Sequence, residues 1–319
     1  MKVLLPIIWH ELTHCIARAF EERGHEVRVV DWRRYAKEQN RHKIEPLCIR
    51  EAMDFHPDVA FCQFQAPGLI TDALPRALNS IGCYSINWSG DVRHPLPDWY
   101  KQLAPHFTVT SFTNWPDVQE ILAMGHGAKF LQIGYDEHIY YPPPPDIERS
   151  GVVFIGNNYG GYKYAESQSR REMVAALSET FGDQFKVYGM SWQGIARHES
   201  IGGYIAEPGD ATILRSAAVA VGWDHFHRPG FASDRLTRAT ACGCAVVNQY
   251  YDGITDEHPW VVPVDTVEAM VEAVGRMLEA PHGGSENARN TLAQHTWTDR
   301  VKQIEQWWTT ARTESKSTS

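Results

Sequence analysis

The chain has 319 residues, of which 43% are hydrophobic and 22% are charged, and its formal net charge is −9. This composition is typical of a globular protein, and the length suits two domains of roughly 150 residues each. The negative net charge argues against a generally basic DNA-binding surface. No apolar run reaches the roughly 18 residues that a membrane-spanning helix needs.

The first thirty residues predict the start of a parallel α/β sheet. An apolar run at 2–8 predicts a buried strand, residues 12–23 predict a helix that stops at Gly24, and 26–31 predict a second strand. Strand, helix and strand in this order are the unit from which such sheets are built. Because no Gly-x-Gly-x-x-Gly pattern lies between the first strand and the helix, we expect no dinucleotide here.

His10-Glu-Leu-Thr-His14 is a literal HExxH motif. On a helix its two histidines share one face and can bind Zn²⁺, with the glutamate as general base. The alternative is a chance match in a chain with fifteen histidines. We favour chance, because the motif follows the first strand directly and no later segment offers a clear third ligand, and we expect no metal. In the turn after the first strand, His10 is instead a candidate catalytic base and Trp9 a candidate acceptor contact.

A basic run follows the second predicted strand. It comprises Arg33, Arg34, Lys37, Arg41, His42 and Lys43. The N-terminal half also carries Trp9, Trp32, Trp88, Trp99 and Trp115. Aromatic rings beside a basic strip suit a flipped base or a single nucleic-acid strand, whereas the plainer interpretation is a solvated loop and tryptophans of the core. We keep both open, with Arg33 and Arg34 as candidate acceptor-binding residues.

The next strands are predicted at 58–64 and 83–87, with a helix at 70–79 between them. The loop Asn87-Trp-Ser-Gly-Asp-Val-Arg93 follows at the carboxyl end of the second of these strands, where open parallel sheets bind their ligands. Asp91 in this loop is a candidate general base, although a turn aspartate that caps the backbone is equally consistent. Trp88 and Arg93 are candidate acceptor contacts.

Two further strands, at 107–111 and 128–133, complete the first half, and a proline-rich stretch follows at 134–145. Four consecutive prolines cannot continue a helix or a central strand, so this stretch predicts an inter-domain linker. We therefore expect an acceptor domain at 1–145, a second domain at 146–295, and a segment at 296–319 with a helix that packs back on the first domain and a frayed tail.

The second half repeats the α/β pattern. A strand is predicted at 151–157, a helix from 169 onward and a strand at 185–190. The segment 229–248 then places a polar, arginine-bearing loop before a helix of small residues, a glycine turn and an apolar strand. A helix N-terminus with Ser233 and Arg235 beside it suits an anion such as phosphate. An ordinary αβ unit is the alternative.

Several motifs between about residue 85 and residue 250 resemble GT-B glycosyltransferases, above all the CgeB-like (spore-maturation protein B) group and its phage-encoded relatives. They are the 87–93 loop, Phe154-Ile-Gly-Asn157, Val187-Tyr-Gly189 and the 229–248 segment. The resemblance implies two Rossmann-like domains with a cleft between them and transfer of a sugar from a nucleotide-sugar, most readily a UDP-sugar. It implies an acceptor hydroxyl, with a 5-hydroxymethylpyrimidine of phage DNA as one possibility.

The resemblance also implies a donor site in the second domain. Its candidate residues are Gly156, Asn157, Arg170, Tyr188, Gly189, Trp192, Ser233, Asp234, Arg235 and Arg238. Many retaining GT-B enzymes carry two glutamates with seven residues between them, where this chain has Gly230 and Arg238. Since the chain has no Asp-x-Asp motif, we expect metal-independent neutralisation of the diphosphate and no cofactor.

Two other activities remain open: a sugar-nucleotide epimerase or hydrolase on the same fold, and a zinc hydrolase built on the HExxH motif. A non-catalytic binding module is a third reading. The six cysteines show no CxxC spacing and lie mostly in apolar segments, which predicts free, buried thiols. The N-terminal apolar run is too short for a signal peptide, so we expect a cytoplasmic protein.

Overall fold

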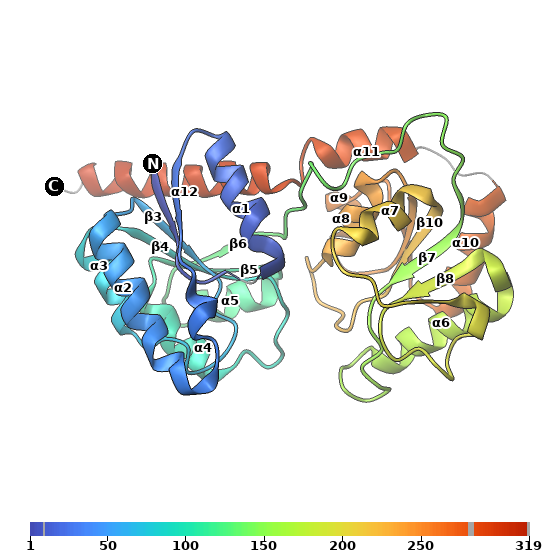
Figure 1. Ribbon diagram of the computed structural model, residues 1–319, viewed down its shortest axis with the longest axis horizontal. Coiled ribbons are helices and arrows are strands. Elements are labelled where there is room, and N and C mark those ends of the chain that lie inside the picture. Colours follow the sequence, from blue (N-terminus) through green and yellow to red (C-terminus); the bar gives the residue numbers. More distant parts are fainter. Residues whose placement is uncertain (9, 280–283, 318–319) are drawn as a thin grey trace. The chain divides into compact units, whose positions relative to one another are not determined.

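The computed structural model describes residues 1–8, 10–279 and 284–317 (Figure 1). The chain divides into two compact units, one formed by Met1–Ile133 with Trp297–Ser319 and the other by Gly134–Thr296. Within the described ranges each unit is built on one six-stranded sheet whose paired strands run parallel. The predicted α/β class is therefore confirmed.

The sheet of the first unit has the order β2-β1-β3-β4-β5-β6. Its strands are β1 (Lys2–Leu5), β2 (Glu26–Val29), β3 (Val59–Cys62), β4 (Tyr84–Ser89), β5 (Val109–Phe112) and β6 (Ala128–Phe130). Strands β3, β4 and β5 are buried along their whole length. Strands covered on both faces of a parallel sheet tend to be apolar throughout, as β3 is, whereas β4 (YSINWS) and β5 (VTSF) also bury polar side chains.

Helices cover both faces of this sheet. They are α1 (His10–Glu22), α2 (Ile44–Phe55), α3 (Ala73–Ser80), α4 (Asp98–Leu103), α5 (Trp115–Ala123) and α12 (Trp297–Ser317), with short 3₁₀ turns η1 (Trp32–Tyr35), η2 (Glu38–Lys43) and η3 (Ala104–His106). The C-terminal α12 contacts α1, buries Trp297 and Val301 in the core of the first unit, and pairs Glu305 with Arg23 at 2.6 Å.

The sheet of the second unit has the order β12-β11-β10-β7-β8-β9. Its strands are β7 (Ser150–Ile155), β8 (Phe185–Tyr188), β9 (Ile201–Gly203), β10 (Ala217–Gly222), β11 (Ala245–Gln249) and β12 (Val262–Val264). Its helices are α6 (Ser167–Phe181), α7 (Gly209–Ser216), α8 (Asp234–Ala241), α9 (Ile254–Glu257), α10 (Val267–Glu279) and α11 (Gly284–Leu292), with 3₁₀ turns η4 (Gly182–Gln184) and η5 (His198–Ser200). None of the described helices is long and apolar enough to cross a membrane.

Two boundaries differ from the sequence-based expectation. The units divide after Ile133 rather than after residue 145, because Tyr135 and Tyr140 are buried in the core of the second unit. The hydroxyl of Tyr140 also donates to the carboxylate of Asp210 at 3.0 Å, so the stretch before the prolines is anchored there. Helix α1 begins at His10 instead of residue 12, which places the HExxH sequence on a helix.

Candidate functional site

The candidate site lies at the carboxyl edge of the second sheet, where β7 and β10 end and α8 begins. Helix α8 starts with Asp234, and the hydroxyl of Ser233 caps it by accepting from the backbone N–H of Arg235 at 3.4 Å. The first turn of a helix presents unpaired N–H groups, and the carboxyl edge of a parallel sheet is where ligands bind. Local sequence thus places the two predicted residues Ser233 and Arg235 at a suitable anion site.

Arg170 on α6 is the most deeply buried cation of this site. It is 2% exposed, its Nη1 donates to the carbonyl of Trp223 at 3.0 Å, and its guanidinium lies 4.8 Å from the centre of the Phe154 ring. A Cβ at Gly156 would lie 2.1 Å from Nη2 of Arg170. Glycine at 156 therefore leaves the space in which this guanidinium sits.

Arg235 pairs with Asp224, a residue directly after β10. Nη2 of Arg235 lies 2.8 Å from Oδ1 of Asp224, and their side chains are 30% and 8% exposed. The Nε atoms of Arg170 and Arg235 are buried without a hydrogen-bond partner among the described residues. Arg235 is thus paired with one buried carboxylate, while Arg170 donates to a backbone carbonyl and lies in the field of Asp224 and Arg235. This arrangement leaves unused donors at this edge.

His225, next to Asp224, shows the effect of this charge. Burial lowers the pKa of its imidazole to about 3, and the positive charges of Arg170 and Arg235 act in the same direction. Burial likewise lowers the pKa of Arg170 to about 9, with a contribution from Arg235. Both ring nitrogens of His225 are buried without a hydrogen-bond partner in the described part of the chain. An anion bound here would relieve this repulsion and fill the open donors.

The loop between β7 and α6 adds aromatic rings and a lysine. Tyr159 and Tyr164 lie 5.1 and 4.9 Å from the ring of His225, and the ammonium of Lys163 lies 4.5 Å from the Tyr159 ring. We call Lys163, Arg170 and Arg235, which all act on the ring of His225, the cation cluster. Lys163 contributes to the depressed pKa of His225, so its charge belongs to the same field.

Other residues that were predicted to bind the sugar donor hold the loops of the site in place. Trp192 is fully buried and its Nε1 donates to the carbonyl of Gly156 at 2.7 Å, so it supports the Gly156 loop instead of contacting a ligand as predicted. Oδ1 of Asn157 accepts from the backbone N–H of Met190 at 2.9 Å. Gly189 has φ +135°, and a Cβ there would lie 2.2 Å from the carbonyl oxygen of Gly156. These contacts fix the β7 and β8 loops against each other.

Two further residues that were predicted to bind the sugar donor, Tyr188 and Arg238, contact other parts of the second unit. The ring of Tyr188 packs against Gly202, where a Cβ would come within 2.3 Å of it. Arg238 pairs with three carboxylates: Glu207 at 3.1 Å, Asp210 at 3.4 Å and Asp234 at 3.1 Å. Burial alone would lower the pKa of Arg238, but these acidic neighbours outweigh it and raise that pKa. The side chain is therefore occupied, contrary to the expectation of a cation available to phosphate.

The candidates of the first unit are more dispersed. Asp91 follows β4 and its side chain is 66% exposed, with Nη2 of Arg93 4.0 Å from its carboxylate. Trp88 was expected to contact the acceptor, but it lies inside β4 and is fully buried. Its Nε1 donates to the carbonyl of Leu131 at 2.9 Å, so Trp88 is a core residue and that prediction is wrong.

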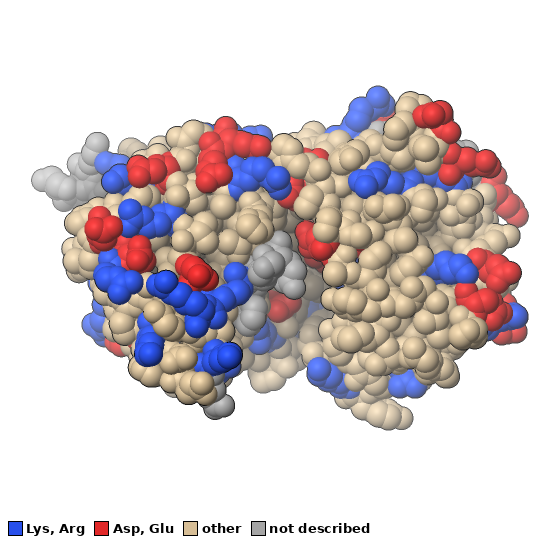
Figure 2. Space-filling model, viewed as in Figure 1, with Lys and Arg blue, Asp and Glu red and all other residues tan. Residues whose placement is uncertain are grey.

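The basic run lies in η1, in η2 and between them. Arg33 donates to the carbonyl of Ile8 at 2.8 Å, while Arg34 is exposed and lies 4.9 Å from the ring of Tyr35. Figure 2 shows several Lys and Arg side chains gathered on the face of the first unit on which α2 appears in Figure 1. Trp9 and the side chain of His10 lie outside the described residues.

Sequence reasoning missed the residues that follow β10. Asp224 and His225 were not singled out, although a polar Trp-Asp-His sequence after an apolar strand was the available signal. Lys163, in the loop between β7 and α6, was missed as well. Among the described side chains, no group of three or more His, Cys, Asp or Glu is placed to hold a metal ion.

Comparison with known proteins gives one family match. Residues 168–306 match the family described as "Glycosyl transferase-like", and this range contains Arg170, Asp224, His225 and Arg235. No curated protein sequence matches the chain.

Solved structures show the same fold at low sequence identity. Sucrose-phosphate synthase from Thermosynechococcus elongatus is 12% identical, with a TM-score of 0.67 over 98% of this chain and 100% of that one. AviGT4, a glycosyltransferase of avilamycin A biosynthesis, is 13% identical, with a TM-score of 0.63 over 97% of each chain. UDP-GlcNAc 2-epimerase from Methanocaldococcus jannaschii is 10% identical, with a TM-score of 0.55 over 96% of this chain and 100% of that one. The chain therefore has the GT-B fold of two Rossmann-like units, and its residues 168–306 are similar to the glycosyl transferase-like family.

Proposed function

We propose that the protein is a glycosyltransferase that binds the diphosphate of a nucleotide-sugar at the cation cluster. The observation that carries this proposal is the positive charge at the carboxyl edge of the second sheet, where Arg235 pairs with Asp224 and the buried Arg170 lies in the field of both. The family match and the shared fold support glycosyl transfer. A UDP-sugar is the first donor to test.

The geometry suggests how the leaving group is stabilised. As the bond between the sugar carbon and the diphosphate oxygen breaks, negative charge grows on the diphosphate. Guanidinium groups already fixed in place stabilise that charge without reorganisation. Arg235 and the N-terminus of α8 would face the diphosphate, and the positive charge of the buried Arg170 would add to the electrostatic attraction. Lys163, from the β7–α6 loop, would supply a further cation.

The acceptor hydroxyl must lose its proton as it attacks the sugar. Asp91 is the proposed general base, because it is a carboxylate at the carboxyl edge of the first sheet and directly follows β4. The acceptor itself is proposed to carry a free hydroxyl, and a 5-hydroxymethylpyrimidine in DNA is one such group. The basic residues of η1 and η2, among them Arg34 and Lys43, favour a polyanionic acceptor of this kind.

The test is nucleotide release and product mass with UDP-, GDP- and CDP-sugars, each with and without hydroxymethylated DNA. Acceptor-dependent release with a sugar-sized mass gain on the acceptor supports the proposal. The Arg235→Ala variant should lose this activity, while Arg276→Ala, an exposed α10 position, should keep it. Absence of donor binding and turnover with all three nucleotide classes would refute a nucleotide-sugar enzyme.

A second candidate is a sugar-nucleotide epimerase, because a UDP-GlcNAc 2-epimerase has the same fold. This activity would convert the sugar nucleotide without any acceptor. Proton NMR of a UDP-sugar incubated with the protein alone separates the two: a new epimer favours the epimerase, and an unchanged donor that is consumed only with an acceptor favours the transferase.

A further inference from the structure

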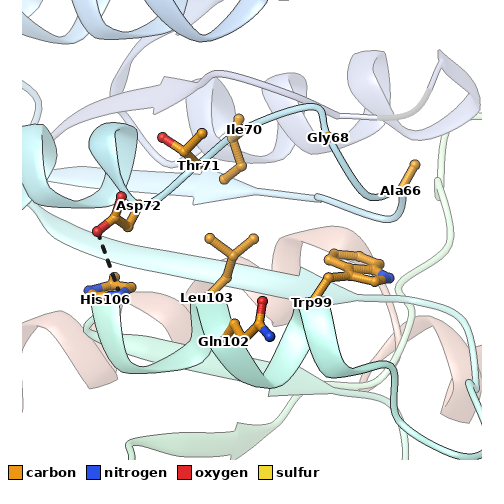
Figure 3. A pocket seen from close by; sticks show the side chains of 9 residues that line it. All are labelled: Ala66, Gly68, Ile70, Thr71, Asp72, Trp99, Gln102, Leu103 and His106. Atoms are coloured by element: carbon orange, nitrogen blue, oxygen red, sulfur yellow. Dashed lines mark ion pairs between the residues drawn. The ribbon is translucent and has the colours of Figure 1, made fainter.

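A groove in the first unit is not used by the proposed reaction. It lies between the loop 66–72, which joins β3 to α3, and the segment formed by α4 and η3, and its volume is about 310 Å³. Figure 3 shows the side chains of the two segments facing each other, with Ile70 pointing toward Leu103 across the gap. The groove starts near the carboxyl ends of β3 and β4, the edge where parallel sheets bind ligands.

Hydrogen bonds hold both walls of the groove in place. The carboxylate of Glu45 accepts from the backbone N–H of Thr71 at 2.8 Å and from its hydroxyl at 3.1 Å, which fixes the upper loop. Nδ2 of Asn79 donates to the carbonyl of His106 at 2.8 Å and ties the end of η3 to α3. A wall that is already ordered costs a ligand little conformational entropy on binding.

The two ends of the groove differ in chemistry. Trp99 offers an aromatic ring at one end, and Asp72 and His106 form an ion pair of 3.9 Å at the other (Figure 3). The hydrogen bond from Arg76 holds the pKa of Asp72 below its usual range, so this carboxylate is ionised and accepts hydrogen bonds at neutral pH. Gln102 adds an exposed amide on α4.

These features select the class of ligand. None of the nine residues drawn along this groove is a Lys or Arg, and His106 already faces the carboxylate of Asp72, so a phosphate would meet the negative charge of Asp72. An uncharged ligand with one apolar face and several hydroxyls matches both ends. A sugar ring has this pattern: its C–H face can lie on an indole, and its hydroxyls can donate to a carboxylate or pair with an amide or imidazole.

We propose that this groove is a saccharide-binding subsite, which takes one uncharged hexose unit of a glycan with the ring against Trp99 and the hydroxyls at Asp72, Gln102 and His106. The subsite lies in the first unit, whereas the cation cluster lies in the second. Saccharide binding there does not require that the transfer reaction occurs.

The test is saturation-transfer NMR on the full-length protein with maltose, cellobiose, lactose and N,N′-diacetylchitobiose, each added alone. We expect transfer to the ring protons of at least one of these saccharides. Trp99→Ala should weaken that binding about tenfold, and the exposed Gln102→Ala should weaken it in a variant that retains the fold. Trp115→Ala is the matched control, because Trp115 is an exposed tryptophan of the same unit that stacks on Phe130 outside the groove.

The outcomes are distinguishable from those of the proposed function. Arg235→Ala should lose donor turnover and keep saccharide binding, and retained binding supports the subsite even if the wild type shows no transferase activity. No saturation transfer to any of the four saccharides would overturn the proposal. Equal binding by the wild type and by folded Trp99→Ala and Gln102→Ala would do the same. Saturation transfer to thymidine or 5-hydroxymethyl-2′-deoxycytidine in place of the sugars would also overturn it if Trp99→Ala abolishes that transfer, because the groove would then be a nucleobase site.

Discussion

Removing Arg235 should damage both the fold and the donor site, and a second substitution should separate the two effects. In Arg235→Ala the carboxylate of Asp224, which is 8% exposed and 2.8 Å from the guanidinium, loses its ion-pair partner. Breaking a buried pair costs about 3–5 kcal/mol. Because the Arg235 side chain is 30% exposed, solvent screening reduces this to about 2 kcal/mol. For a unit of this size we expect a fall in melting temperature of about 4–8 °C.

The double variant Arg235→Ala/Asp224→Ala removes both charges and leaves no unpaired carboxylate. Its unfolding free energy should recover only part of the loss, because no carboxylate is left unpaired but the buried Arg170 loses the favourable charge of Asp224. Its affinity for UDP should stay at the level of the single variant. Denaturant unfolding followed by circular dichroism gives the first quantity, and isothermal titration calorimetry with UDP gives the second.

Two results would refute this reasoning. If the double variant binds UDP as tightly as the wild type, Arg235 does not hold the diphosphate. If Arg235→Ala is as stable as the wild type, Asp224 does not depend on that pair, and the charge balance described for the site is wrong.

Three further predictions concern the binding of UDP, the pH dependence of stability and the rate of turnover. Gly156→Ala should weaken UDP binding about tenfold or more, because its Cβ would displace the guanidinium of Arg170; calorimetry checks this against Gly275→Ala, which meets no atom within 4 Å. The pKa of His225 lies at about 3 in the folded protein and at about 6.5 in the unfolded chain. Between these two pH values the unfolded state binds the extra proton, so the free energy of unfolding falls as the pH falls. His225→Gln should flatten that loss in denaturant unfolding at pH 7 and pH 4.5, and an unchanged slope would contradict the burial of the ring. Asp91→Asn should lower turnover by about 10²–10⁴ with UDP affinity unchanged, and normal turnover would remove Asp91 from the role of base.

Local pattern was sufficient for the α/β class and for the position of Ser233 and Arg235 at the start of α8. Apolar runs bounded by glycines and polar loops mark buried parallel strands whatever the tertiary context. The serine cap and the arginine that follows it are neighbours in sequence, so the arrangement of Ser233 and Arg235 could be predicted from the segment itself. Arg170 was also placed correctly in a first helical turn, although its burial was not foreseen.

Partners from distant segments could not be predicted. Arg238 was expected to face phosphate, but Glu207 and Asp210 arrive from the loop before α7 and from its first turn and occupy it. Trp88 was expected in a loop, but it belongs to β4 and its side chain is buried in the core. In both cases the deciding neighbour lies far along the chain, and a single sequence contains no signal for that contact.

The sequence by itself determined which segments are strands, where a capped helix meets an arginine, and that the chain is long enough for two units. Only the tertiary structure decided which charges remain uncompensated, because that depends on how many carboxylates the fold brings to each guanidinium. It gave Arg238 the carboxylates of Glu207, Asp210 and Asp234 and gave Arg235 that of Asp224, while Arg170 donates to a backbone carbonyl instead. Charge in a low-dielectric environment is costly until it is paired, and this is the physical reason for proposing an anion at Arg170 and Arg235.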